Sequence, residues 1–158
     1  MSRRDQIQMT GEEVLAFLDE QEVMTCATFG PRGWPHLMPL WYVVRDGRLW
    51  AWTFAKSQKA KNLERDPRAT LQVEAGGGQY HLLRGVMLEC ETSVHHDLDT
   101  VLGVGLDVFR RYTGGDATGE LAPEVEAMVR TQAEKRIAME FVELRRATWD
   151  HRKLGGTY

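Results

Sequence analysis

Apolar residues recur along this chain at helical spacing in some segments and at strand spacing in others. The spacing in each segment predicts whether it forms a helix or a strand. Thr10 and Glu13 form a capping box, and the apolar side chains after them keep a helical period. A first helix is therefore expected up to about Glu20. The next stretch, EVMTCATFG at residues 22–30, is rich in β-forming residues and predicts a strand.

The stretch WPHLMPLWYVVRDGRLWAWTF, residues 34–54, predicts a β-hairpin. The Asp-Gly pair at its centre is a strong turn signal between two apolar runs. Residues 37–44 are apolar at almost every position, which predicts a strand covered on both faces. Pro39 lies inside this run and cannot donate a ladder hydrogen bond, so we expect the sheet to be open or bulged there.

A short helix and a second pair of strands are expected next. Ser57 can cap a helix over residues 58–65, and the Asp-Pro pair that follows ends this helix because the residue before proline disfavours helical angles. RATLQVEA, residues 68–75, and QYHLLRGVMLECETS, residues 79–93, then predict two strands joined across three glycines.

The last third of the chain predicts two helices and a long strand. Helical spacing runs over residues 94–112, although glycines weaken it, and TGGDATGE at residues 113–120 predicts a loop. Proline at a first helical position starts a helix over residues 123–135. RIAMEFVELRRATW, residues 136–149, predicts the final strand.

Length and composition favour one domain. The chain has 158 residues, of which 42% are hydrophobic, and this is enough for a sizeable core. We expect a single domain over residues 1–158 with flexible tails at residues 1–9 and 150–158. A net charge of −3 offers no general attraction to nucleic acid or an anionic membrane. No apolar run is long enough for a signal peptide or a membrane span, so a cytoplasmic protein is expected.

The cysteines and the paired histidines do not predict a metal site. Cys26 and Cys90 lie far apart in predicted strands, which is typical of reduced thiols in a core. His95 and His96 are adjacent, so on a helix their side chains point about 100° apart, and no further cluster of ligands accompanies them.

The basic stretch AKSQKAKNLERDPRA, residues 55–69, gathers lysines at the start of the short helix. Lys56 and Lys59 lie beside or within the first turn, where the helix dipole disfavours cations unless an anion is bound. This placement favours a phosphate site. The alternative is that Lys56, Lys59 and Lys61 form a solvated face, as runs of charge usually do.

Residues 33–76 resemble the split β-barrel flavin and deazaflavin oxidoreductase superfamily, the relatives of pyridoxamine 5'-phosphate oxidase. The signature is the hairpin G.PH..P.WYV..DG.LW..T followed by KSQKAKNLERDPRA, the short helix that in this family packs beside the cofactor phosphate. The likeness extends more loosely from about Thr10 to Trp149. It implies a mainly β fold with flanking helices, the six-stranded split β-barrel that binds FMN in some members. It also implies a homodimer with the cofactor in a groove between the subunits.

The resemblance also indicates which coenzyme to expect. The pyridoxamine phosphate oxidase branch carries an Arg and a Lys on the strand that corresponds to residues 37–43, and both hold the flavin phosphate. This chain has LMPLWYV there and is more similar to the branch that binds the deazaflavin coenzyme F420. By resemblance, the phosphate would be held by Thr53, Ser57, Gln58, Lys59 and Asn62. The anionic oligoglutamate tail would lie near Lys56, Lys61 and Arg65. The ring would be lined by His36, Leu37 and Pro39, with Tyr80 reaching in from the partner subunit.

The expected function is therefore a homodimeric reductase that delivers hydride from reduced F420 to a conjugated, electron-poor organic substrate. Bulk water, Tyr80, Tyr42 or His36 would supply the proton. Two alternatives stay open: an FMN-dependent oxidoreductase of the same fold, and a non-catalytic protein that binds a flavin or haem.

Overall fold

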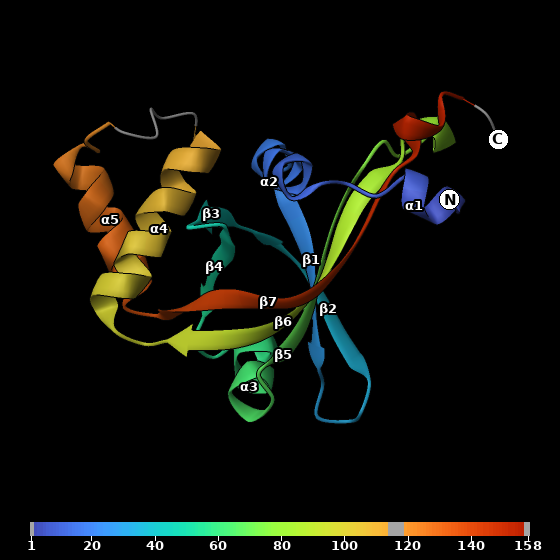
Figure 1. Ribbon diagram of the computed structural model, residues 1–158. Helices are drawn as coiled ribbons and strands as arrows, with labels where there is room; N and C mark the ends of the chain where they lie inside the picture. Colours follow the sequence, from blue (N-terminus) through green and yellow to red (C-terminus); the bar gives the residue numbers. More distant parts are fainter. Residues whose placement is uncertain (1, 114–118, 157–158) are drawn as a thin grey trace.

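In the computed structural model, which describes residues 2–113 and 119–156, one antiparallel sheet is bent into a barrel with helices around it (Figure 1). The strands follow the order β2-β1-β5-β6-β7-β4-β3. Their bounds are β1 Val23–Phe29, β2 Pro35–Trp41, β3 Val43–Arg45, β4 Arg48–Phe54, β5 Arg68–Ala75, β6 Arg84–His95 and β7 Arg136–Asp150. The helices are α1 Arg3–Gln6, α2 Gly11–Glu20, α3 Gln58–Arg65, α4 Leu98–Thr113 and α5 Pro123–Ala133, with 3-10 turns η1 Tyr80–Leu82 and η2 His151–Leu154.

The described sheet has seven strands where six were predicted, because the long apolar run is broken at Tyr42. β2 and β3 are the two edges of the sheet, and Tyr42 alone joins them, so the chain passes directly from one edge to the other. The Tyr42 backbone N–H lies outside the ladder and donates to Tyr112 Oη at 3.0 Å. The Tyr42 hydroxyl in turn donates to the carbonyl of Leu18 at 2.6 Å. A buried tyrosine therefore makes the corner that closes the predicted split barrel.

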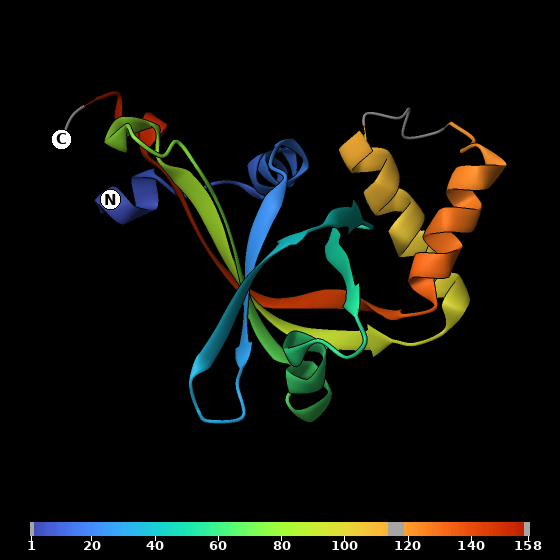
Figure 2. The same cartoon turned by 180° about the vertical axis from the view of Figure 1, so that it is seen from behind.

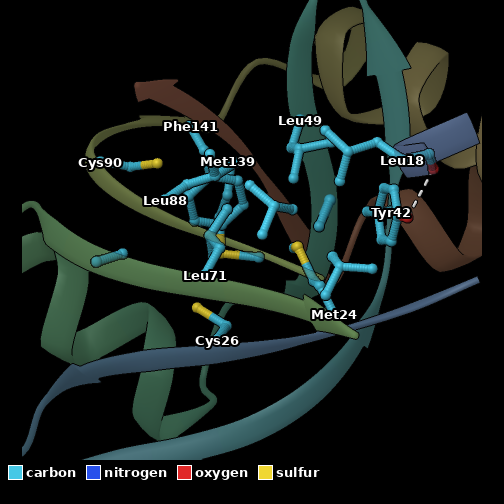
Figure 3. Close-up of a cluster of buried hydrophobic side chains, with 14 of the residues drawn as sticks. Leu18, Met24, Cys26, Tyr42, Leu49, Leu71, Leu88, Cys90, Met139 and Phe141 are labelled. Carbon is cyan, nitrogen blue, oxygen red and sulfur yellow. Dashed lines mark hydrogen bonds between the residues drawn. The ribbon is translucent and has the colours of Figure 1, made fainter. Parts of the chain in front are cut away.

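The barrel interior is filled with apolar side chains. Alternate residues of the strands point inward, and the enclosed side chains labelled in Figure 3 include Met24, Leu71 and Met139, each fully buried. Cys26 and Cys90 lie in the same core as free thiols, and burial raises the pKa of each to about 12. A packed interior leaves the ends and the outer faces of the barrel for ligands.

A second apolar cluster lies beside the barrel, where α4 and α5 cover the outer side of β4 and β7 (Figure 1). Gly105 allows this contact, because a Cβ there would lie 2.5 Å from the Trp52 ring. Gly105, one of the glycines that weaken the helical pattern, is therefore a packing position. The helix begins later than predicted: Val94 belongs to β6 and pairs with Met139, and α4 starts only after Asp97 accepts from the Thr100 N–H.

The two ends of the described chain lie close together, far from α3, in both views (Figures 1 and 2). Residues 1–9 and 150–158 were predicted as tails, and their described parts contact the sheet: the Asp150 N–H donates to the Ile7 carbonyl at 2.7 Å. β6 begins at Arg84 and not at residue 79, because η1 takes up the intervening residues. Most of the predicted loop at residues 113–120 lies outside the described residues.

Of the helices in the described part of the chain, none combines the length and the apolar character that crossing a bilayer requires.

Candidate functional site

Helix α3 has the predicted bounds and turns its lysines to different surroundings. The Ser57 Oγ caps it by accepting from the Ala60 N–H at 3.3 Å, as the sequence predicts. Lys59 lies on the buried face of the helix, whereas Lys56 and Lys61 are exposed. Lys56 and Lys61 therefore fit the alternative of a solvated face, and Lys59 does not.

Lys59 is a cation without a counter-charge among the described residues. The residue is only 9% exposed, and its Nζ donates to Thr53 Oγ1 at 3.0 Å. The Thr53 hydroxyl lies 3.4 Å from Ser57 Oγ, so two hydroxyls and an ammonium group meet at the start of α3. Burial lowers the pKa of Lys59, and the positive charge of Arg136 adds to this effect. The structure thus brings Thr53, Ser57 and Lys59 together in an arrangement that an anion would complete.

Asn62 holds neighbouring residues of the protein in place through hydrogen bonds. It is fully buried, and its Nδ2 donates to Thr28 Oγ1 on β1 at 3.0 Å. Its Oδ1 accepts from Gln58 Nε2 at 2.8 Å and from Arg65 Nη2 at 3.4 Å. Asn62 therefore fixes α3 to the barrel and orients Gln58 and Arg65. Thr28 is a partner that the sequence analysis did not identify.

Strand β2 separates the predicted ring-lining residues onto two faces. His36 pairs with Thr28 and so faces the same side as this buried threonine, where it lines a small pocket of about 160 Å³ with Gln58. Its Nδ1 is buried and makes no hydrogen bond within the described residues. Leu37 and Pro39 follow the strand alternation to the outside and are exposed. The structure therefore joins His36 to the α3 residues and places Leu37 and Pro39 on the opposite face.

Tyr80 lies far from α3 within one chain. It begins η1 at the end of the molecule that holds the termini, and its ring lies 4.9 Å from that of His151 in an edge-on contact (Figures 1 and 2). Its predicted approach to the cofactor from a partner subunit stays a prediction. Tyr42, the other tyrosine considered as a proton donor, is fully buried in the barrel corner.

Arg136 is a charged residue near this site that the sequence analysis did not identify. It opens β7 opposite Phe54, and its guanidinium lies 4.4 Å from the Trp52 ring and 4.0 Å from the Phe54 ring. Burial lowers its pKa, and its Nε is buried without a hydrogen-bond partner in the described chain. Only the pairing of β4 with β7 reveals this position, because the sequence shows Arg136 merely as the first residue of a strand.

The outward side of β1 and β2, together with Leu144 of β7, carries exposed apolar side chains. We call Val23, Phe29, Leu37, Trp41 and Leu144 the outer apolar face; each is between 47% and 66% exposed. In a single chain, the prediction that residues 37–44 are covered on both faces is wrong for the part that lies in β2, an edge strand with exposed residues on its outer side, whereas Tyr42 and Val43 are buried. A groove of about 360 Å³ runs across this face between Phe29 and Leu144.

The paired histidines make other contacts. His95 stacks on Trp50, and its Nε2 lies 3.3 Å from Glu140. His96 lies 3.6 Å from Glu64. The described residues contain no group of three His, Cys, Asp or Glu side chains that could hold a metal ion.

Comparison with protein families matches residues 10–148 of the chain to the family described as pyridoxamine 5'-phosphate oxidase. A solved structure of a conserved hypothetical protein from Mycobacterium tuberculosis is 39% identical to the chain and has a TM-score of 0.89. This similarity covers 100% of this chain and 95% of that one. A search of curated proteins gave no match.

Two more distant structures share the fold. An F420 reductase is 18% identical, with a TM-score of 0.62 over 83% of this chain and 93% of its own. The haem storage protein HutZ from Vibrio cholerae is 14% identical, with a TM-score of 0.65 over 88% of this chain and 92% of its own. The fold therefore occurs in proteins described as a reductase and as a haem storage protein.

Proposed function

Because the chain belongs to the pyridoxamine 5'-phosphate oxidase family, we propose that it is a reductase that uses coenzyme F420 to transfer hydride to a conjugated organic substrate. The observation that carries this proposal is the uncompensated Lys59 beside the Thr53 and Ser57 hydroxyls at the start of α3. A phosphate there would supply the missing negative charge and accept hydrogen bonds from all three groups.

Strand β2 favours the deazaflavin over FMN. In the oxidase branch, an Arg and a Lys of the corresponding strand hold the flavin phosphate, whereas β2 here reads PHLMPLW and offers neither. Each such charge-assisted hydrogen bond contributes roughly 1.5–3 kcal/mol. Without them, FMN should bind more weakly than a coenzyme whose oligoglutamate tail can use the exposed Lys56 and Lys61.

The residues present fit the coenzyme in both charge and hydrogen-bonding capacity. Lys59, Thr53 and Ser57 would hold the phosphate, and Gln58, oriented by Asn62, would lie beside it. The buried and unpartnered Nδ1 of His36 is available to a polar atom of the ring. When bound, reduced F420 supplies the hydride.

In the proposed reaction, the residues of this chain hold the coenzyme and orient its ring. The filled barrel leaves no room for the ring inside, so the ring would lie along β2 on the side of His36. Leu37 and Pro39, on the opposite face of this strand, would meet the partner subunit. His36 lies beside Gln58 of α3, and its imidazole could donate the proton that the reaction needs. Tyr80 would donate from a partner subunit.

A homodimer is part of this proposal. A second copy would cover the outer apolar face, which a single chain leaves exposed, and would bring Tyr80 to the site. A cytoplasmic location also belongs to the proposal, because two buried cysteines stay free as they would in a reducing compartment.

Titration of the coenzyme-free protein with F420 and with FMN, followed by absorption and fluorescence, tests the proposal. We expect F420 to bind at least about ten-fold more tightly than FMN, which corresponds to the loss of one charge-assisted contact. Equal or tighter binding of FMN would contradict the assignment. A haem spectrum in the purified protein, with no affinity for either coenzyme, would favour the non-catalytic alternative.

A further inference from the structure

The 3-10 turns η1 and η2 pack against each other at the end of the molecule that holds the termini, far from α3 (Figures 1 and 2). Strand β5 leads from α3 to this end, and its eight residues rise by about 27 Å at roughly 3.4 Å each. Tyr80 on η1 therefore cannot reach Lys59 of its own chain. If the Tyr80 ring contacts a coenzyme at α3, that coenzyme is held by the other subunit.

The backbone around Tyr80 forms a closed turn. The Gln79 N–H donates to the Gly76 carbonyl at 3.2 Å, and the Leu83 N–H donates to the Tyr80 carbonyl at 3.2 Å. Gly76 has a φ of +87°, and a Cβ there would lie 2.1 Å from the Leu82 carbonyl oxygen. The chain therefore needs glycine at this position to fold back onto η1.

Turn η2 holds the Tyr80 ring from the side. The His151 N–H donates to the Leu83 carbonyl at 2.9 Å, which joins the two turns. The His151 ring lies edge-on to the Tyr80 ring, with 4.9 Å between the ring centres. Edge-on aromatic contacts of this kind favour one orientation of the two rings. Tyr80 is still 57% exposed, so His151 orients a ring that a ligand can reach.

Hydrogen bonds and ion pairs fix η2 in turn. The buried Asp150 carboxylate caps η2 by accepting from the Arg152 N–H at 3.1 Å, and it also pairs with the Arg152 guanidinium. Lys153 Nζ donates to the Gln8 carbonyl at 2.7 Å and to Glu13 Oε2 at 2.6 Å. The C-terminal turn is therefore fastened to α2 and to the chain that precedes it.

We propose that η2 positions Tyr80 for the coenzyme of the partner subunit, and that His151 is the positioning residue that contacts Tyr80. This inference rests on the proposed function, since it needs F420 at the α3 residues and a homodimer. A two-fold axis perpendicular to β5 would turn the partner end over end and bring its η1 towards α3. Orienting the ring before the coenzyme arrives lowers the entropy that is lost on binding.

The test measures the affinity of F420 for variants of the two turns by fluorescence. Tyr80→Leu should weaken F420 by about three- to ten-fold, the size expected when one aromatic contact is lost. His151→Leu should weaken it by at least about three-fold, and the double variant should be no weaker than Tyr80→Leu alone, because His151 acts through Tyr80. His151→Phe keeps an aromatic edge and should restore the parent affinity. His81→Leu, at an exposed histidine of η1, is the matched control and should change nothing.

A mixed dimer tests whether Tyr80 serves the other subunit. One chain carries Lys59→Met and the other carries His151→Leu, each with its own affinity tag. If Tyr80 acts across the dimer, one of the two sites combines an intact Lys59 from one chain with an intact His151 from the other. Calorimetry should then find one site with the parent affinity and one site with both defects.

The outcomes separate this inference from the coenzyme assignment. Mixed dimers in which each site carries a single defect would overturn the inference, and so would parent affinity in the Tyr80→Leu or His151→Leu protein. A double variant weaker than Tyr80→Leu would also overturn it. In these cases the parent protein still binds F420, so the coenzyme assignment is not affected. Failure of the parent protein to bind F420 would contradict the proposed function itself, and this inference with it.

Discussion

Two surfaces on either side of strand β2 are incomplete in opposite ways. The inner one, with His36, Thr53 and Lys59, holds polar groups that lack a negative charge or a hydrogen-bond partner. The outer apolar face holds apolar side chains that a single chain leaves partly exposed. Missing charge and missing apolar cover call for occupants of different chemistry, and the proposed function assigns an anionic coenzyme to the inside and a second copy of the chain to the outside.

The largest expected effect concerns the outer surface. Leu37→Glu places a charge in the middle of the proposed interface, where burial without a partner is strongly unfavourable, so the dimer dissociation constant should rise roughly a hundred-fold or more. Light scattering over a concentration series measures it. Leu15→Glu, on the exposed side of α2, is the control and should leave the dimer intact. A parent protein that is monomeric, or a Leu37→Glu protein that stays dimeric, would contradict the claim that a second copy covers the outer apolar face.

The next effect concerns the support of the inner surface. Asn62→Ala removes a fully buried amide and its hydrogen bonds to Thr28, Gln58 and Arg65, so the free energy of unfolding should fall by roughly 2–4 kcal/mol. Urea unfolding measures the loss. Lys61→Ala, one residue away and exposed, should change it by less than about 0.5 kcal/mol. Similar losses in both variants would mean that Asn62 does not fix α3 in the way described.

The smallest effect is a gain in stability from removing the uncompensated charge. Burial lowers the pKa of Lys59, so the folded chain holds this proton less tightly than the unfolded chain does. Charged Lys59 therefore costs stability at neutral pH, and the cost shrinks as the pH rises from the lowered pKa towards the ordinary lysine value. Lys59→Met should stabilise the coenzyme-free protein by roughly 0.5–2 kcal/mol at pH 7, and by less at higher pH.

Urea unfolding of the Lys59→Met protein at several pH values, with Lys61→Met beside it, measures this gain. Lys61 is exposed, so its replacement should have little effect at any pH. A loss of stability in Lys59→Met, or a gain that does not change with pH, would show that Lys59 is not a strained cation.

Local rules were enough to predict much of the fold. The cap at Ser57 and the stop at Asp66 gave α3 its observed bounds, because both depend on neighbouring residues alone. The hairpin at Asp46 and Gly47 was confirmed for the same reason. The break at Tyr42 was missed because its N–H finds its acceptor on Tyr112, seventy positions along the chain.

The sequence could predict which way a site residue faces wherever the helical or strand period decides it. Lys59 and Lys61 differ by about 200° around a helix, so only one of them could face the barrel. Strand alternation likewise separates His36 from Leu37. Arg136 could not be predicted, because its place beside Trp52 depends on the register of β4 against β7, two strands more than eighty residues apart.

The affinity of F420 for the matched variants Lys59→Met and Lys61→Met tests the central claim most directly. Methionine keeps the length of the side chain and removes its charge, so the two proteins differ only in which face of α3 loses a cation. We expect Lys59→Met to weaken F420 by about ten- to a hundred-fold, as the loss of a charge-assisted contact requires, and Lys61→Met to weaken it far less. Equal losses in the two variants would mean that the lysines act as a diffuse basic surface, and would contradict a phosphate site at Lys59.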